Sequence, residues 1–203
     1  TPAVGLANNW YDWQGGKFCI NTNQLYRPAG SNSWVGTGLY RGGSEFFLDQ
    51  RIVVDYPAGH QPGAIYLRFN TSTSACIWFN TPSGGYVGKL TSFGNYTGQA
   101  GSWTWAYDNT HAYQVDCRVW GTAPTNWAIT ITDVTTSTVV VNTSGTVTGA
   151  VEAAGAVGLE GGIGGGNRVS RVRAYSGQFE IGTLNPVAAS VTLTNVGLTW
   201  GAT

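Results

Sequence analysis

The chain contains one stretch in which apolar and polar side chains alternate without a break: Tyr113-Gln-Val-Asp-Cys-Arg-Val-Trp120. Successive side chains of a β-strand point to opposite faces, so this period of two predicts a strand over His111–Trp120 with one buried face. The expected inward set is Tyr113, Val115, Cys117 and Val119, and the expected outward set is Gln114, Asp116, Arg118 and Trp120. A strand with one buried and one solvated face is typical of antiparallel sheets.

Two further runs predict strands of the same kind. In Ala64–Asn70 the expected inward set is Ile65, Leu67 and Phe69, and the outward set is Tyr66 and Arg68. In Glu45–Asp55 the inward set is Phe46, Leu48, Ile52 and Val54, and the outward set is Phe47, Asp49, Arg51, Val53 and Asp55. Trp78 points outward if Ile77 and Phe79 of its own run point inward, because a shift of one residue exchanges the two faces.

Short apolar runs bounded by Gly, Pro, Asn and Ser clusters fill most of the remaining chain and predict further strands. These are expected near Lys17–Asn21, Val35–Tyr40, Ala75–Phe79, Tyr86–Ser92, Asn126–Asp133, Val139–Asn142, Gly155–Gly161, Val169–Tyr175 and Ser190–Val196. No segment has the sustained apolar period of about 3.6 residues that a helix requires. We therefore predict an all-β protein, a two-sheet antiparallel jelly-roll sandwich over residues 1–182. Residues 183–203 would form a tail or an added strand of the same domain.

The charge composition argues against a partner that is recognised through a long-range field. Lys and Arg total 10, as do Asp and Glu, and 10% of the residues are charged. We therefore expect no nucleic-acid partner. No apolar run approaches the roughly 20 residues that span a bilayer, so we expect no membrane insertion. Low charge with abundant Gly, Thr, Asn and Trp favours an extracellular, secreted or virion-surface location.

The three cysteines lack metal-ligand spacing, and their odd number prevents complete pairing. Cys19, Cys76 and Cys117 are expected either as buried free thiols or as one disulfide with one thiol left over.

The order of the runs resembles the concanavalin A-like lectin and glucanase superfamily, which includes laminin-G-like modules. The matching segments are Trp10-Tyr-Asp-Trp before Lys17-Phe-Cys-Ile, Phe46-Phe-Leu-Asp-Gln-Arg-Ile-Val-Val-Asp before Gly63-Ala-Ile-Tyr-Leu-Arg-Phe, Tyr113-Gln-Val-Asp-Cys-Arg-Val-Trp before Trp127-Ala-Ile-Thr-Ile-Thr-Asp, and Gly155-Ala-Val-Gly-Leu-Glu-Gly before Arg168-Val-Ser-Arg-Val-Arg-Ala-Tyr. The resemblance spans roughly Trp10 to Ile181 and implies a concanavalin A-like sandwich. This fold carries lectins, hydrolases, lyases and scaffolds alike, so the function has to be argued from the site.

The catalytic patterns of such proteins are missing from the sequence, which favours a non-catalytic protein without settling the question. Glycosidases need two carboxylates about 5 to 9.5 Å apart, and the hydrolases of this superfamily carry them as Glu-x-Asp-x-Glu, which does not occur here. Asp49 and Asp116 remain as a pair only if their strands are neighbours. His60 and His111 stand outside any Gln-x-His or Tyr-x-Lys motif, and there is no Gly-x-Ser-x-Gly elbow.

Aromatic residues are more numerous than a core of this size requires, with nine Trp and ten Tyr. Trp13, Trp34 and Trp127 are the expected core members. Surplus indole and phenol rings can stack on the C–H faces of sugars. If the three alternating strands share one sheet, their outward side chains would form a glycan site. The predicted ligand-binding residues are Asp49, Arg51, Tyr66, Arg68, Trp78, Asp116, Arg118 and Trp120.

The sequence thus favours a non-catalytic, lectin-like carbohydrate-binding module that binds a glycan or polysaccharide. It would act as a receptor-binding or adhesion domain within a larger multidomain or oligomeric assembly. The alternatives are a virion or cell-surface structural module, and a polysaccharide lyase or glycoside hydrolase. No cofactor is implied. Calcium occurs in lectins of this fold, but it needs six to eight oxygen ligands, and no Asp/Asn cluster identifies them.

Overall fold

Runs rich in β-branched and aromatic residues form strands throughout the protein, because these side chains pack well on a pleated, half-buried surface. The computed structural model describes residues 10–13, 19–21, 24–26, 38–41, 46–70, 72–73, 75–92, 95–149, 153–160, 168–176, 179–186 and 191–194. Strands are the only regular elements in these ranges, which confirms the all-β prediction. Within the same ranges no helix is long and apolar enough to cross a membrane.

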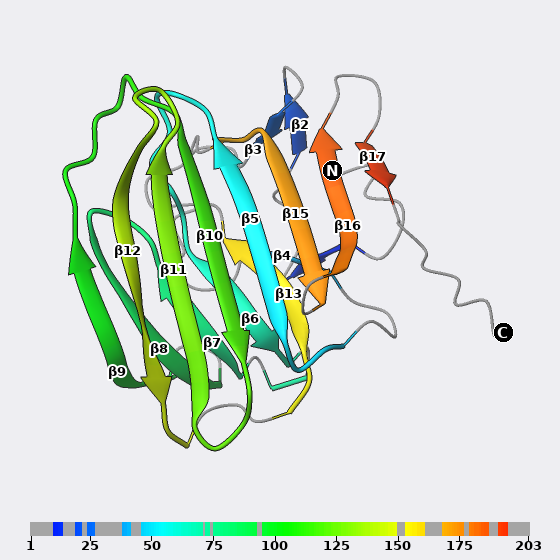
Figure 1. Cartoon of the computed structure of the whole chain (residues 1–203). Helices are drawn as coiled ribbons and strands as arrows, with labels where there is room; N and C mark the ends of the chain where they lie inside the picture. The colour runs from blue at the N-terminus through cyan, green and yellow to red at the C-terminus, as the bar shows by residue number, and fades with distance from the viewer. Residues whose placement is uncertain are drawn as a thin grey trace, which may run out of the picture.

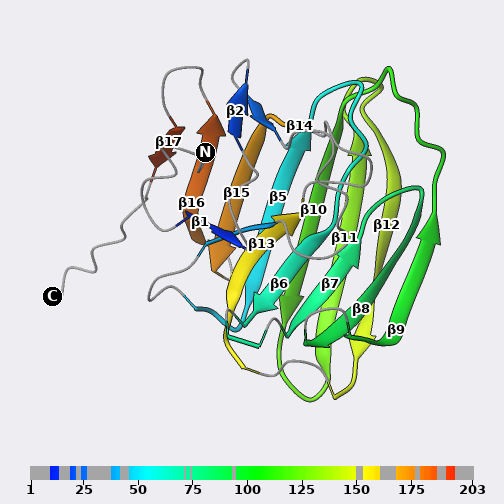
Figure 2. The same cartoon turned by 180° about the vertical axis from the view of Figure 1, so that it is seen from behind.

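Two antiparallel sheets of seven strands face each other (Figures 1 and 2). The front sheet, which is nearer the viewer in Figure 1, runs in the order β12 (Thr138–Val147), β11 (Thr125–Asp133), β10 (Tyr113–Trp120), β5 (Gln50–Tyr56), β15 (Arg171–Ser176), β16 (Phe179–Pro186) and β17 (Val191–Thr194). The back sheet runs in the order β1 (Trp10–Trp13), β4 (Gly38–Arg41), β13 (Ala156–Glu160), β6 (Ile65–Phe69), β7 (Cys76–Asn80), β8 (Gly84–Ser92) and β9 (Asn95–Thr104). A small sheet joins β14 (Arg168–Val169), β3 (Gln24–Tyr26) and β2 (Cys19–Asn21). The predicted two-sheet antiparallel sandwich is confirmed.

The main hydrophobic core lies between the two sheets. All four inward side chains predicted for β10 belong to it, and each is at most 1% exposed. Ile52 and Val54 of β5 pack opposite Ile65 and Leu67 of β6 in the same cluster. The polar partners on β10 alternate outward as predicted, and Trp120 at the end of the strand is 39% exposed.

A second apolar cluster covers the outer side of the back sheet. Its members are Ala64, Tyr66, Phe69, Cys76, Trp78, Leu90 and Ala156, with Tyr86 packed against them. Ile77 and Phe79 of β7 point into the main core, so Trp78 faces outward in the favoured register. Its indole meets the ring of Tyr86 edge-on at 5.6 Å between centroids. Facing away from the main core therefore does not mean facing solvent on this sheet, because Trp78 is only 6% exposed.

A β-bulge at Arg68 overturns the faces predicted for the end of β6. The pairing of β6 with β13 shifts register here, and Arg68 has a left-handed φ of 53°. An extra residue in one strand reverses the alternation beyond it. Arg68 therefore turns into the protein and is fully buried, while Phe69 joins Tyr66 in the outer cluster at 6.0 Å between ring centroids. The prediction that Phe69 points inward and Arg68 outward was wrong for this reason.

The face assignment for β5 holds only from Gln50 onward. Residues 46–49 precede the ladder, and their β-pairing is an isolated bridge between Phe47 and Gly155. Without a ladder to set the alternation, Phe46 is 40% exposed and Leu48 is half-buried, although both were predicted as core residues.

Strands β1, β3, β9 and β16 were not predicted. Asn95–Thr104 contains Gly98 and Gly101, which weaken the strand pattern, and its pairing with β8 supplies the order that its own sequence does not. Strand β16 continues through positions 182 and 183, and β17 pairs with it at the edge of the front sheet, near the predicted tail strand. The division into residues 1–182 and 183–203 stays a prediction.

The cysteines whose side chains are described are both buried, and Cys117 is a free thiol. Cys117 lies in the main core and Cys76 in the outer cluster. The side chains of Cys19 and Trp13, and Trp34 altogether, lie outside the described residues.

The indole of Trp127 on β11 fills the space between β9 and β12, which are edge strands of the two sheets. The side chain is 2% exposed, as predicted for a core residue, and its ring centroid lies 6.3 Å from that of Phe79 and 6.5 Å from that of Trp103. Glycines stand on both sides of the indole. A Cβ at Gly101 would come within 2.4 Å of Cζ2, and one at Gly145 within 2.8 Å of the same atom. The tryptophan fits only because both positions lack side chains.

Replacement of Gly101 with alanine should lower the free energy of unfolding by about 1–3 kcal/mol, because the added methyl overpacks the indole. Chemical denaturation monitored by Trp fluorescence measures this change. Gly84→Ala on β8 is the matched control, since a Cβ there meets nothing within 4 Å. Equal stability of the two variants would contradict the packing described for Trp127.

Candidate functional site

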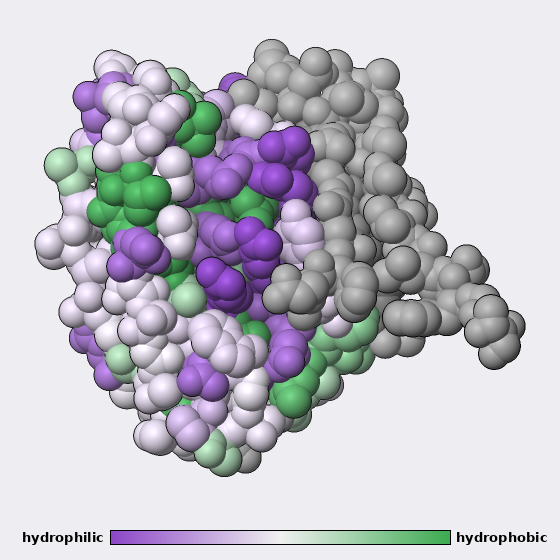
Figure 3. Space-filling model, viewed as in Figure 1, coloured by the Kyte–Doolittle hydropathy of each residue, from purple (hydrophilic) through white to green (hydrophobic). Residues whose placement is uncertain are grey.

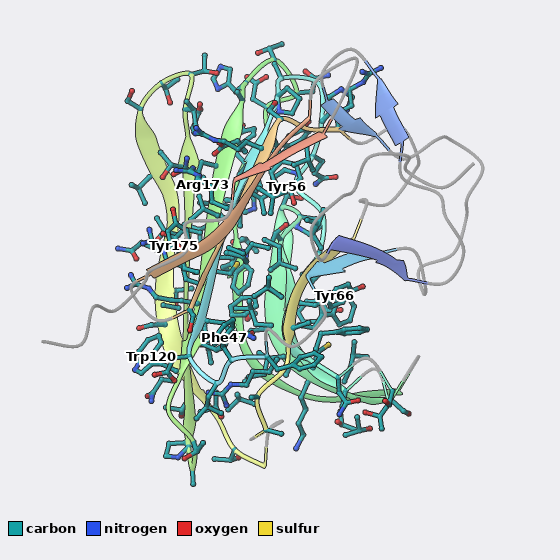
Figure 4. The ribbon with its side chains drawn as sticks, turned by 90° about the vertical axis from the view of Figure 1, so that its right-hand side faces the viewer. Phe47, Tyr56, Tyr66, Trp120, Arg173 and Tyr175 are labelled. Carbon is teal, nitrogen blue, oxygen red and sulfur yellow. The ribbon has the colours of Figure 1, made fainter. Side chains whose placement is uncertain are left out.

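The outer side of the front sheet carries most of the polar residues predicted as a site. Arg51 on β5 lies directly opposite Arg118 on β10 and opposite Tyr175 on β15. Figure 3 shows hydrophilic side chains gathered over the middle of this face, and Figure 4 shows Tyr175, Arg173 and Trp120 on the side of the front sheet that faces away from the back sheet. We call the face formed by the outward residues of β10, β5 and β15 the arginine face.

Arg51 and Asp116 form the central ion pair of the arginine face. Nε of Arg51 donates to Oδ1 of Asp116 at 2.9 Å, and Nη2 donates to Oδ2 at 2.6 Å. The hydrogen bond to Asp116 raises the pKa of Arg51 above its ordinary value. The guanidinium also lies over the ring of Tyr175, with 5.2 Å between Cζ and the ring centroid, which adds a cation–π contact.

A second polar group lies further along the same strands, centred on Asp55. Its Oδ2 accepts a hydrogen bond from Nε of Arg171 at 2.7 Å, and its Oδ1 accepts from Nη2 of Arg173 at 3.2 Å and from Nε2 of Gln114 at 2.7 Å. Nε of Arg173 is buried and has no hydrogen-bond partner. Asp55 thus joins three strands of the front sheet on their outer face.

Arg118 and Trp120 complete the arginine face at the end of β10. Both side chains are exposed, and within the described part of the chain no hydrogen bond or ion pair holds Arg118. Asp49 lies close by, where its Oδ1 accepts a hydrogen bond from the backbone N–H of Gly121 at 3.0 Å. An exposed indole beside charged hydrogen-bonding groups can stack on an apolar ring face while its neighbours bind polar substituents.

Three of the predicted ligand-binding residues do not belong to this face. Strand β6 lies in the back sheet, whereas β5 and β10 are neighbours in the front sheet. Tyr66 and Trp78 therefore point away from the arginine face and are 5% and 6% exposed, with Tyr66 labelled on the opposite side in Figure 4. The condition on which the predicted site depended, that the three alternating strands share one sheet, is met by β5 and β10 but not by β6.

Arg68, the third of these residues, lies between the sheets. Its Nε donates to the backbone oxygen of Leu48 at 2.7 Å, and Nη2 donates to the backbone oxygen of Gly121 at 2.5 Å. Nη1 donates to Oγ1 of Thr125 at 2.9 Å. These contacts place the guanidinium in a structural network and away from any surface ligand.

Sequence reasoning missed Arg171, Arg173 and Tyr175 as members of the arginine face. Their signal was present, because Arg171-Val-Arg-Ala-Tyr175 alternates with period two. That period shows that the three side chains share a face, but it does not show that β15 lies next to β5.

His111 takes a structural position between two aspartates. Nδ1 of His111 lies 2.6 Å from Oδ2 of Asp133, and Nε2 lies 3.7 Å from Oδ2 of Asp108. Burial alone would raise the pKa of Asp133, but hydrogen bonds from His111 and Thr136 hold it below its ordinary value. The pKa of Asp108 is lowered by its hydrogen bonds from Thr110. A catalytic acid needs a raised pKa, so neither carboxyl group suits that role.

The acidic side chains of the described residues do not cluster as metal ligands. No group of three or more His, Cys, Asp or Glu side chains among them could hold a metal ion. Asp55, Asp116 and Asp133 are each engaged by cationic side chains or His111. Calcium needs six to eight oxygen ligands, and in this part of the chain clustered carboxylates do not supply them.

Solved structures with a similar fold include lectin-like domains. The legume lectin-like domain from Entamoeba histolytica is 11% identical with a TM-score of 0.51, and the match covers 83% of this chain and 90% of that one. The exoplasmic/lumenal domain of VIP36 is 11% identical in its Ca2+/Man3GlcNAc-bound form, with a TM-score of 0.52, covering 87% of this chain and 89% of that one. The metal-free form of VIP36 is also similar, at 11% identity and a TM-score of 0.50, with 85% and 89% covered.

These likenesses define the class of fold. The chain has the concanavalin A-like β-sandwich fold of legume lectin-like domains, which confirms the fold predicted from the sequence. No model of a known protein family and no curated protein sequence matches the chain. At 11% identity the likeness concerns the fold, so the function is argued from the arginine face.

Replacement of Arg68 with methionine should destabilise the protein by about 3–5 kcal/mol, because the buried oxygens of Leu48, Gly121 and Thr125 lose their donor. Arg118→Met makes the same chemical change on the surface and should alter stability by no more than about 0.5 kcal/mol. Urea denaturation measures both variants. Equal stability would show that Arg68 is not a structural residue.

Acid should weaken the contact between the 108–111 turn and the end of β11. The pKa of Asp133 is lower in the folded protein than its ordinary 3.8. Its ionised form therefore stabilises the fold above that value, and the contribution is lost as the pH falls through the folded pKa. Asp133→Asn should lower stability at pH 7 and flatten the decline in stability as the pH falls below the ordinary pKa of 3.8. Thermal unfolding measured from pH 7 into the acid range below 3.8 tests this expectation. Parallel plots of melting temperature against pH for the variant and the wild type would contradict the role given to the Asp133 carboxylate.

Proposed function

We propose that this protein is a non-catalytic, lectin-like carbohydrate-binding module whose glycan binds the arginine face around Trp120. The observation that carries the proposal is that an exposed indole and charged hydrogen-bonding side chains lie together on this one face. Trp120 offers an indole surface that is 39% exposed, and Arg118, Arg51 and Asp116 offer directed hydrogen bonds beside it. Sugars present flat C–H faces to aromatic rings and hydroxyl pairs to such polar groups.

The similar structures support the same class of ligand. VIP36 was solved in Ca2+/Man3GlcNAc-bound, Ca2+/Man-bound and Ca2+/Man2-bound forms. Carbohydrate binding on this sandwich architecture is therefore demonstrated in a protein of the same fold. The proposal for the present chain uses its own residues and no calcium.

Five of the eight residues predicted from sequence remain in the proposed site. They are Asp49, Arg51, Asp116, Arg118 and Trp120, and Tyr175 is added to them. Tyr66, Arg68 and Trp78 are omitted because they are buried elsewhere. An exposed binding face suits an extracellular receptor-binding or adhesion domain of a larger protein, and we retain that role and location as part of the proposal.

A glycan array with the whole chain, followed by calorimetry on the bound glycans, tests the function. Trp120→Ala should weaken glycan binding by about 1–3 kcal/mol, the range of a stacked aromatic anchor. Its melting temperature should stay close to that of the wild type, because the side chain lies outside the core.

The matched control is Val139→Ala. Val139 is 54% exposed on β12 of the same sheet, two strands away from β10. It should leave the affinity unchanged. Unaltered affinity of Trp120→Ala, or its unfolding, would overturn the site, and a wild-type chain that binds no glycan would overturn the function.

A further inference from the structure

Two arginines stand directly opposite each other on neighbouring strands of the arginine face. Arg118 of β10 is the cross-strand partner of Arg51 of β5, and both point outward. Directly opposite side chains have Cβ atoms about 4.5–5.5 Å apart, and like charges in that position destabilise a sheet. Asp116 neutralises Arg51 through two hydrogen-bonding nitrogens. Nothing in the described part of the chain neutralises Arg118.

The same face has an excess of positive charge although the whole chain has none. Lys plus Arg equals Asp plus Glu in the sequence, at 10 each. Among the described side chains of β5, β10 and β15, four arginines stand against two aspartates. Asp49, just before β5, adds one more carboxylate and is bonded to the backbone of Gly121. Asp116 pairs with Arg51, whereas Arg171 and Arg173 share Asp55. One uncompensated arginine therefore lies in the group around Asp55, and the other is Arg118, next to the exposed indole of Trp120.

We propose that the glycan bound by this face is acidic, and that a uronate carboxylate binds between Arg118 and Arg51 while its ring lies on Trp120. This inference rests on the proposed carbohydrate-binding function. A carboxylate entering there removes the repulsion between the two guanidinium groups. A neutral sugar would leave that repulsion in place. The ligand class is therefore polysaccharides that contain uronic acids.

The geometry of the face favours a carboxylate in particular. A guanidinium presents parallel N–H groups that match two carboxylate oxygens. Arg51 already binds the carboxylate of Asp116 in this way through Nε and Nη2. Its Nη1 has no partner in the described part of the chain, and Arg118 has all of its donors available there.

The test uses polygalacturonate, alginate and hyaluronate, each beside its carboxyl-reduced form, in which the acid is a neutral alcohol. Affinity electrophoresis and calorimetry with the whole chain measure binding at fixed salt. At least one acidic polymer should bind about ten- to a hundredfold more tightly than its reduced form, as expected for a charge-assisted hydrogen bond. Arg118→Gln should remove most of that preference.

Lys89→Gln is the control for net charge. Lys89 belongs to β8 of the back sheet, where its Nζ donates to the backbone oxygen of Gly149 at 2.7 Å. This variant should keep the preference for the acidic polymer. An equal loss in both variants would mean attraction by overall charge and would overturn the inference.

The remaining outcomes separate the inference from the proposed function. Equal binding of acidic and reduced polymers, or binding of neutral glycans alone, overturns the inference that the ligand is acidic. Either result remains consistent with the proposed carbohydrate-binding function. Tighter binding of dextran sulfate than of every uronate polymer overturns the inference that the face recognises a carboxylate. Failure to bind any polymer, here and on the glycan array, overturns the proposed function itself.

Discussion

The buried guanidinium of Arg68 is the contact on which one end of the sandwich depends. It comes from the back sheet and donates to the backbone oxygens of Leu48 and Gly121, which flank the ends of β5 and β10 in the front sheet. The side chain of Gln50 extends this link, since its Nε2 donates to the oxygen of Gly155 and its Oε1 accepts from the N–H of Arg68 at 2.6 Å. Polar groups buried without partners are costly, so these bonds hold the segments in one arrangement.

The glycine at position 155 allows this network to form. A Cβ there would come within 2.4 Å of the backbone carbon of Arg68. The close approach accompanies the bulge that turns Arg68 inward. The segment before β5 and the turn after β10 are held by the same arginine, and Asp49, Arg51 and Trp120 lie next to these two segments. The interior network thus positions the end of the arginine face that carries Asp49 and Trp120, although Arg68 itself lies in the interior.

The two sheets differ in what covers their outer sides. The back sheet carries an apolar outer cluster in which Trp78 and Tyr66 are buried. The front sheet carries charged residues, threonines and an exposed indole. Figure 3 shows hydrophilic residues gathered on this face. An aromatic side chain can act as a binding surface only where it is accessible, so the same residue type has a packing role on one sheet and a candidate binding role on the other.

The sequence by itself determined the faces of individual strands. Alternation over Tyr113–Trp120 and from Ile52 to Asp55 predicted which side chains point inward, and Trp127 was correctly expected in the core. These patterns are local, because each strand needs one apolar side. Only the tertiary structure decided that β5 pairs with β10 and β15 while β6 lies in the other sheet, since pairing is a contact between distant segments. The bulge at Arg68 likewise depends on Gly155, which is far away in the chain, and no local pattern could reveal it.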